Sequence, residues 1–214
     1  MIIKLFLLGR PGSGKSSCYQ FIVQYMKKKL PSWSVIPFDD YEILWKKFLE
    51  DTRGEVFFAT MPGGFGIYYP PIVLSDVLIE LEEISQKFIL DTNRDLLVTI
   101  EFARADYYQS LKLFSDDFRK GAYYLFIETD IETCKNRIHK RYFSGLQSRK
   151  HFVADEIMEN YYGVDSQQYM LTDFKKDFGV DDGRIRIIDN YSTWDKFTEQ
   201  VNLFIASLIE QENL

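Results

Sequence analysis

Eight residues near the amino terminus constrain this chain more than any other feature. Residues 9–16 read Gly-Arg-Pro-Gly-Ser-Gly-Lys-Ser and follow an apolar run at residues 2–8. The pattern G-x-x-x-x-G-K-[ST] between a strand and a helix is the signature of a phosphate-binding loop. Its glycines let successive backbone N–H groups face a polyphosphate, and the following helix adds the positive end of its dipole. We therefore expect the chain to bind a nucleoside triphosphate.

Each residue type in this loop has an expected task. Lys15 is expected to reach the β- and γ-phosphate oxygens, and the Ser16 hydroxyl is expected to bind Mg²⁺. The guanine-reading pattern Asn-Lys-x-Asp is missing from the sequence, so ATP is the expected nucleotide. The residues expected to bind it in the loop are Gly9, Arg10, Pro11, Gly12, Ser13, Gly14, Lys15, Ser16 and Ser17.

Composition narrows the class of protein. The 214 residues are 46% hydrophobic and 27% charged, as in a soluble globular protein with a well-buried core. The net charge of −6 argues against nucleic acid or an anionic membrane as a partner of the whole surface. No run approaches the roughly 18 apolar residues of a membrane span. Cys18 and Cys134 lack metal-ligand spacing, so they are expected to be buried, reduced thiols in a cytoplasmic protein.

Apolar runs alternate with amphipathic segments along the chain. The runs predict strands at residues 2–8, 33–38, 95–101, 122–128 and 184–189. Helices are predicted at residues 15–30, 41–50, 75–90, 104–118 and 131–142, and a last one opens at 192–195. This order predicts a single α/β domain over residues 1–214, with the three-layer α/β/α fold of phosphate-loop NTPases and a five-stranded parallel sheet. One face of the last helix is expected to carry Trp194, Phe197, Val201, Phe204, Ile205 and Leu208.

Two segments interrupt the alternation. Residues 39–75 and 143–183 look like insertions at the carboxyl ends of strands, where open α/β sheets bind their ligands. Within the first, Pro62-Gly63-Gly64 and Pro70-Pro71 indicate turns, so residues 51–73 are predicted to be irregular.

An aspartate pair follows the second predicted strand. A carboxylate there suits a phosphotransferase, because it orients the acceptor hydroxyl and takes its proton. Asp39 and Asp40 are therefore candidates for catalysis and for binding the acceptor. In the alternative, Asp39 caps the next helix and Glu42 completes a capping box, and the pair can also divide the two roles.

A second carboxylate, Glu101, ends the strand at 95–101. An apolar strand that ends in a carboxylate is similar to a Walker B strand, which holds Mg²⁺ directly or through water. Glutamate in place of the common aspartate leaves binding of the acceptor open as the competing role. Arg104, shortly after it, is expected to contact the acceptor or to pair with Glu101.

The segment at residues 133–154 is basic and contains no Asp or Glu. Arg137 and Arg141 are one helical turn apart and share a face. The segment resembles the arginine-bearing lid of nucleoside monophosphate kinases, which implies that these arginines stabilise the charge of the transferring phosphoryl group. The alternative is a solvated basic face. The basic residues of the segment are Lys135, Arg137, His139, Lys140, Arg141, Arg149, Lys150 and His151.

The loop sequence, with the aspartate pair, the strand-ending glutamate and the basic segment in this order, resembles the adenylate-kinase-like and zeta-toxin-like P-loop kinases. The resemblance implies that residues 133–160 form a helical lid and that residues 39–75 hold the acceptor-binding insertion. It also implies that Asn190, after the last strand, contacts adenine, although Asn is an ordinary turn residue too.

The function expected from these features is ATP- and Mg²⁺-dependent phosphoryl transfer to a small molecule or nucleotide. Within the same chemistry, the acceptor of a zeta-toxin-type enzyme would be a nucleotide sugar. From other classes, a non-catalytic nucleotide-binding regulatory module and a kinase of nucleic-acid 5′-hydroxyl groups remain alternatives. The acceptor and the oligomeric state do not follow from the sequence.

Overall fold

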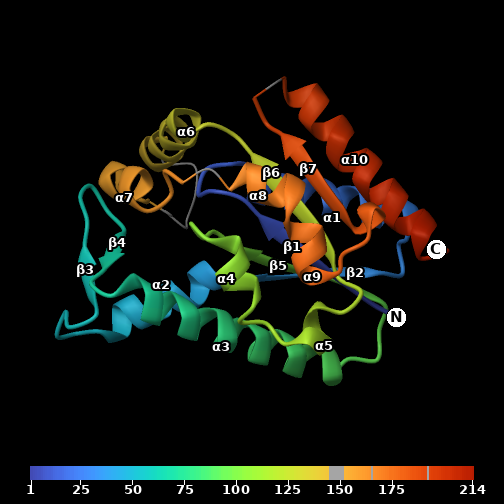
Figure 1. Ribbon diagram of the computed structural model, residues 1–214, viewed down its shortest axis with the longest axis horizontal. Coiled ribbons are helices and arrows are strands. Elements are labelled where there is room, and N and C mark those ends of the chain that lie inside the picture. The colour runs from blue at the N-terminus through green and yellow to red at the C-terminus, as the bar shows by residue number, and fades with distance from the viewer. Residues whose placement is uncertain (145–151, 165, 192) are drawn as a thin grey trace.

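The computed structural model describes residues 1–144, 152–164, 166–191 and 193–214. Within them, five parallel strands form one sheet in the order β2-β5-β1-β6-β7 (Figure 1). The central strand β1 is flanked by β5 and β6, so it is buried between neighbours on both sides. The strands span Ser34–Asp39 (β2), Leu96–Phe102 (β5), Ile2–Leu8 (β1), Tyr123–Glu128 (β6) and Ile185–Asp189 (β7).

Helices cover both faces of this sheet and enclose two apolar cores. One core lies under α1 (Lys15–Lys29) and α10 (Trp194–Gln211). The other contains a group of stacked and edge-on rings around Phe6. Its helices are α2 (Asp40–Glu50), α3 (Pro70–Leu90), α4 (Tyr107–Leu111), α5 (Asp116–Arg119), α8 (Gln167–Thr172) and α9 (Phe174–Phe178). The predicted layered α/β fold with a five-stranded parallel sheet is confirmed.

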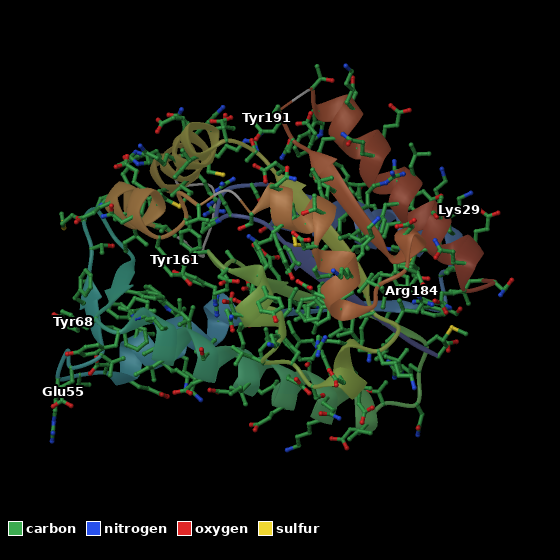
Figure 2. All side chains as sticks on the ribbon, in the orientation of Figure 1. Lys29, Glu55, Tyr68, Tyr161, Arg184 and Tyr191 are labelled. Atoms are coloured by element: carbon green, nitrogen blue, oxygen red, sulfur yellow. The ribbon has the colours of Figure 1, made fainter. Side chains whose placement is uncertain are left out.

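The segment predicted to be irregular contains a β-hairpin. Strands β3 (Phe57–Ala59) and β4 (Phe65–Ile67) pair antiparallel. The Asp51 carboxylate accepts N–H bonds from Val56 and Phe57 at 2.8 Å and fixes the entry to β3. Strands of three residues are too short to show an alternating pattern, so the sequence gives no strand signal here. Figure 2 labels Glu55, just before β3, and Tyr68, just after β4, at the end of the hairpin opposite its turn.

Two helix boundaries also differ from expectation. Helix α3 begins at Pro70 and not near residue 75, because Pro70 and Pro71 occupy its first positions, where no N–H partner is needed. The helix predicted at 104–118 is two short helices, α4 and α5. Ser115 caps α5, and both its N–H and its hydroxyl bond to Glu82 on α3, which fixes the break.

Helix α6 (Ile131–Phe143) begins after its N-cap Asp130, whose side chain accepts from the Thr133 N–H. It is followed by α7 (Asp155–Asn160), and the short 3₁₀ helix η1 (Asp182–Arg184) precedes β7. Trp194 departs from the predicted apolar face of α10: it is 58% exposed, because it stands at the first position of the helix. No helix in the described part of the chain is long and apolar enough to cross a membrane.

Candidate functional site

The phosphate loop runs from β1 into α1, as its sequence predicts. Gly12 and Gly14 have φ angles of 81° and 116°, in the left-handed region where a side chain would be strained. A Cβ on Gly14 would also lie 2.5 Å from the Asn190 amide nitrogen. Lys15 is 7% exposed, and its ammonium donates to the Gly9 and Arg10 carbonyls at 2.9 and 3.1 Å. The loop therefore wraps around a buried positive charge.

The residues of the loop fit a triphosphate with magnesium. Helix α1 begins at Gly14, which offers no side-chain cap, so the positive end of the helix dipole faces the loop. The buried Ser13 hydroxyl has no hydrogen-bond partner among the described residues. Ser16 is exposed at the start of α1. No group of three or more acidic, His or Cys side chains in the described segments makes a metal cage, and Mg²⁺ bound by phosphates needs only one or two protein ligands.

Arg10 has a role that the motif does not disclose. Its guanidinium bonds to the Glu128 carboxylate at 2.9 Å and to the carbonyls of Tyr162 and Val164 at 2.8 and 2.9 Å. A further bond reaches the Thr129 carbonyl at 3.1 Å. The side chain thus fastens the segment after α7 to the phosphate loop, and only the backbone of Arg10 remains for a nucleotide.

Asp39 and Glu101 lie side by side at the carboxyl edge of the sheet. They are register partners on β2 and β5, and Glu101 Oε1 is 3.9 Å from Lys15 Nζ. Burial, together with the charges of Glu101 and Asp40, raises the pKa of Asp39 to about 8. Burial also raises the pKa of Glu101, and the Lys15 ammonium opposes that shift. Two crowded carboxyl groups next to a phosphate loop have the chemistry to bind metal or to take a proton near neutral pH.

Asp39 is also the N-cap of α2, since its Oδ1 accepts the Tyr41 N–H at 2.9 Å. The predicted cap by Asp39 is therefore confirmed, and it does not exclude a chemical role because the second oxygen remains.

We predict that Asp39→Asn stabilises the protein. The native Asp39 carboxyl holds its proton up to about pH 8, whereas the unfolded chain releases it near 3.8, so native stability falls as pH rises through that window. Asparagine keeps the cap and removes the charge. The variant's gain should be near zero at pH 4 and about 1–3 kcal/mol at pH 8. Urea unfolding at both pH values measures it, and an equal gain at the two would contradict the assignment.

Asp40 points away from Asp39 into the protein. It is 5% exposed and forms a buried ion pair with Arg104, which is 4% exposed. Arg104 donates in addition to the carbonyls of Ala103 and Leu74 at 2.7 and 3.1 Å. Burial acts to lower the pKa of Arg104, but the charge and hydrogen bond of Asp40 together with Tyr162 and Tyr161 outweigh burial and raise that pKa, so the guanidinium stays charged. The structure does not show the expected pairing of Arg104 with Glu101. Arg104 pairs with Asp40 instead.

The basic segment divides into two groups. Lys135 pairs with Glu132 and Glu159, and His139 Nε2 lies 2.7 Å from Asp155, so these two meet acidic neighbours. The two predicted site arginines, by contrast, turn toward the phosphate loop and the carboxylates. Arg149, Lys150 and His151 lie outside the described residues.

Those arginines reach different parts of the site. Arg137 donates to the Ser13 carbonyl at 3.3 Å and to the Asn190 carbonyl at 3.2 Å. Arg141 is half-buried, which lowers its pKa, and the charges of Tyr41 and Glu101 act against that shift. Arg137 therefore contacts Asn190 in the loop after β7, and Arg141 lies within electrostatic reach of Glu101.

Asn190 is 4% exposed, and its amide donates to the Ser13 carbonyl at 2.6 Å. It ties the loop after β7 to the phosphate loop, and its amide nitrogen is used in doing so.

Two residues at the site were missed by sequence reasoning. The Tyr107 hydroxyl accepts the Gly9 N–H at 2.8 Å, and nothing in the sequence around α4 marks it. Glu128 bonds to Arg10 and to the Tyr191 hydroxyl. Glu128 ends an apolar strand just as Glu101 does, so the same signal was present there.

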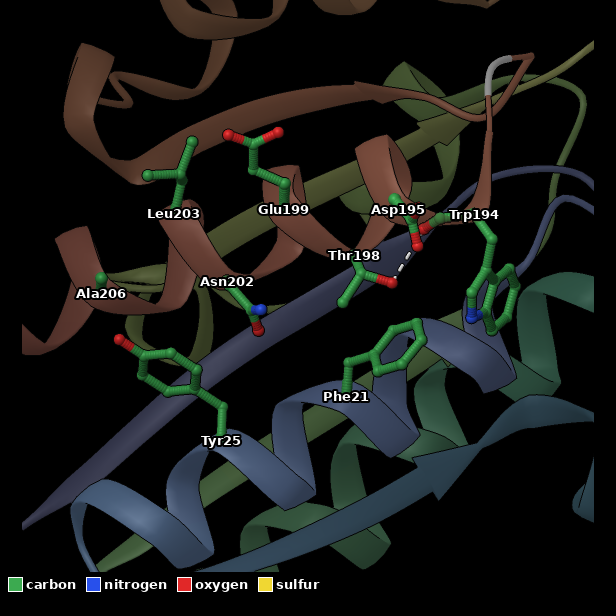
Figure 3. A pocket seen from close by; sticks show the side chains of 9 residues that line it. All are labelled: Phe21, Tyr25, Trp194, Asp195, Thr198, Glu199, Asn202, Leu203 and Ala206. Carbon is green, nitrogen blue, oxygen red and sulfur yellow. Dashed lines mark hydrogen bonds between the residues drawn. The ribbon is translucent and has the colours of Figure 1, made fainter.

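A groove of about 590 Å³ lies between α1 and α10 (Figure 3). None of the predicted site residues lines it. Its lining residues are Phe21, Tyr25, Trp194, Asp195, Thr198, Glu199, Asn202, Leu203 and Ala206.

No protein-family model and no curated protein sequence matches this chain. Solved structures do. A gluconokinase from Sinorhizobium meliloti 1021 aligns with a TM-score of 0.59 at 14% identity, over 99% of this chain and 95% of that one. TT1252 from Thermus thermophilus aligns with a TM-score of 0.52 at 14% identity, over 97% of each chain. At such identity the likeness establishes architecture and not activity. The chain thus shares the α/β fold of these two structures, with a five-stranded parallel sheet and flanking helices.

Proposed function

We propose that this protein is an ATP- and Mg²⁺-dependent phosphotransferase that acts on a small-molecule or nucleotide acceptor in the cytoplasm. One observation carries the proposal: the Lys15 ammonium of the phosphate loop lies 3.9 Å from Glu101, whose strand partner is Asp39. A cation for phosphate oxygens and a carboxyl group suited to a hydroxyl proton are therefore neighbours. The gluconokinase fold supports the same chemistry.

In the proposed reaction the acceptor oxygen attacks the γ-phosphorus of ATP. The new O–P bond forms as the bond to the β,γ-bridging oxygen breaks, ADP leaves, and the acceptor proton passes to the Asp39 carboxylate. A pKa of about 8 lies close to physiological pH, so a fraction of the Asp39 carboxyl groups is ionised there, and each ionised group is a stronger base than an exposed aspartate. Most of the catalysis is positioning and charge stabilisation, since the γ-phosphoryl group needs little covalent help.

Other residues divide the remaining tasks. Lys15 and Arg141 stabilise charge on the transferring group, and Arg137 with Asn190 holds the lid and the loop after β7 against the phosphate loop. Ser16 and Glu101 would hold a magnesium ion, which would supply positive charge to the phosphate oxygens. We assign Asp40 and Arg104 to holding the acceptor side in shape, because each engages the other in the interior.

Calorimetry with purified protein tests the first step. We expect MgATP to bind, and MgGTP to bind more weakly because no guanine-reading motif is present. Nucleotides, sugars and amino sugars are then screened for acceptor-stimulated release of ADP. Folded protein that gives no heat with any magnesium triphosphate would overturn the proposal. Binding without transfer to any acceptor would instead favour the regulatory module.

A further inference from the structure

The hydroxyl of Tyr107 is bound to the first residue of the phosphate loop. Tyr107 opens α4, which follows β5 after a short loop (Figure 1). Its hydroxyl oxygen accepts the Gly9 N–H at 2.8 Å, although the two residues are 98 positions apart in the chain. The phosphate-loop motif is contiguous and contains no such residue, so this contact reaches the loop from another part of the fold.

The same glycine also holds the ammonium of the loop lysine. The Gly9 carbonyl accepts from Lys15 Nζ at 2.9 Å, and the Arg10 carbonyl accepts from it at 3.1 Å. The N–H and the carbonyl of Gly9 stand on either side of one Cα, so a backbone rotation that moves the first also moves the second. Through this single residue, Tyr107 is connected to the charge that is proposed to meet the phosphates.

Gly9 has little room to choose another partner. Its φ is 137°, and a Cβ there would lie 2.5 Å from the Ile127 carbonyl oxygen and 2.8 Å from Ser13 Oγ. Backbone packed this closely cannot turn far toward a different acceptor. A buried N–H that loses its acceptor also has no water to replace it, which makes the loss costly. The orientation of Gly9 therefore depends on the Tyr107 hydroxyl.

The side chain of Tyr107 is itself held in place. It is 2% exposed, and its ring centroid lies 5.4 Å from that of Phe126 and 5.9 Å from that of Phe102. Asp106 caps α4 by accepting the Gln109 N–H at 3.0 Å. Burial raises the pKa of Tyr107, so its hydroxyl stays neutral. A neutral hydroxyl on a packed ring is suited to fixing a backbone group at one position.

We propose that Tyr107 is a positioning residue of the phosphate loop, which through Gly9 sets where the Lys15 ammonium stands relative to the phosphates of the nucleotide. This inference rests on the proposed function and deepens it. Tyr107 acts without touching the nucleotide, because it works through the backbone of Gly9. The stabilisation that one charge gives to another depends on their distance, so a small displacement of the ammonium weakens its effect on the phosphates.

The test compares Tyr107→Phe with a matched control, Tyr123→Phe. Each variant removes one hydroxyl from a buried ring and keeps the ring itself. The Tyr123 hydroxyl donates to Glu212 at 2.7 Å, and Tyr123 begins β6, at the opposite end of that strand from the phosphate loop. The control therefore loses a hydrogen bond of similar length that does not reach the loop. We expect a comparable decrease in the thermal midpoint of both variants.

The first readout is hydrogen exchange of the Gly9 amide, followed by NMR without nucleotide. We expect this amide to be protected in wild type and in Tyr123→Phe, and to exchange about tenfold faster in Tyr107→Phe. An unprotected Gly9 amide in wild type, or equal exchange in wild type and Tyr107→Phe, would overturn the proposal.

The second readout is a double-mutant cycle of Tyr107→Phe with Lys15→Ala, measured as MgATP affinity by NMR titration into the millimolar range. We expect Tyr107→Phe to weaken binding about fivefold when Lys15 is present and to cause no further loss in Lys15→Ala, because the ammonium that it positions is gone. Tyr123→Phe should bind MgATP as wild type does. An equal loss in both backgrounds, or the same loss in the control, would overturn the positioning role.

The two readouts separate failure of this inference from failure of the proposed function. Wild type that binds no MgATP would overturn the proposed function and the positioning role with it, whereas the exchange of the Gly9 amide would still decide whether Tyr107 holds the loop.

Discussion

Replacing Lys15 with alanine is expected to lower phosphoryl transfer at least about 10³-fold while the fold survives. Among the described residues, the ammonium donates to the Gly9 and Arg10 carbonyls and lies 3.9 Å from Glu101, and Lys15 belongs to neither of the two apolar cores. What the variant loses is the charge that meets the transferring phosphoryl group. Turnover is measured as acceptor-stimulated ADP formation with the acceptor found in the screen.

The matched control is Lys46→Ala. Lys46 is 73% exposed on α2, and its contact with Glu50 at 3.9 Å is worth little at the surface. We expect normal turnover from it and an unchanged thermal midpoint in both variants. Normal transfer by Lys15→Ala would refute the mechanism, and a collapse of its thermal midpoint would show that Lys15 acts through the fold.

The fold was largely predictable because its signals are local. The three central strands, β1, β5 and β6, are runs of apolar residues that are mostly buried on both faces, and such runs are visible without knowing their partners. The phosphate loop is equally local, since its glycines and Lys15 are contiguous. The hairpin at 57–67 was not predicted because its strands are short. The start of α3 was predicted wrongly because Pro70-Pro71 can open a helix as well as mark a turn.

The sequence indicated which residues lie near the site, but not what each of them contacts there. Sequence places Asp39 and Asp40 together, but only the register of β2 on β5 sets Asp39 beside Glu101, and only the packing of α2 turns Asp40 toward Arg104. Neighbours in sequence thus enter different environments. Arg10 shows the same limit: four bonds to residues far along the chain define its role, and no local pattern encodes them.

The Asp40–Arg104 pair gives the largest expected effect on stability. Asp40→Ala should lower the free energy of unfolding by about 3–5 kcal/mol, because it leaves the Arg104 guanidinium buried with only carbonyl partners. The reciprocal change, Arg104→Met, strands the Asp40 carboxylate and should cost a similar amount. The double variant Asp40→Leu with Arg104→Met removes both charges, and we expect it to recover most of the loss. Urea denaturation of wild type and the three variants measures these losses and the recovery.

These variants and Asp39→Asn together distinguish the roles of the two aspartates. Asp39→Asn should be more stable than wild type at pH 8 and should lose phosphoryl transfer. The Asp39 carboxylate destabilises the fold because it is buried near Glu101 and Asp40, but the proposed reaction needs it as the base. Asp40→Ala should lose stability, and the Leu–Met double variant should regain transfer together with its fold, because the pair shapes the acceptor side without touching the acceptor. A double variant that folds as well as wild type but transfers no phosphate would show that Asp40 or Arg104 contacts the substrate. The interior pair would then be part of the reaction itself, and the division of roles between the neighbouring carboxylates would have to be reversed.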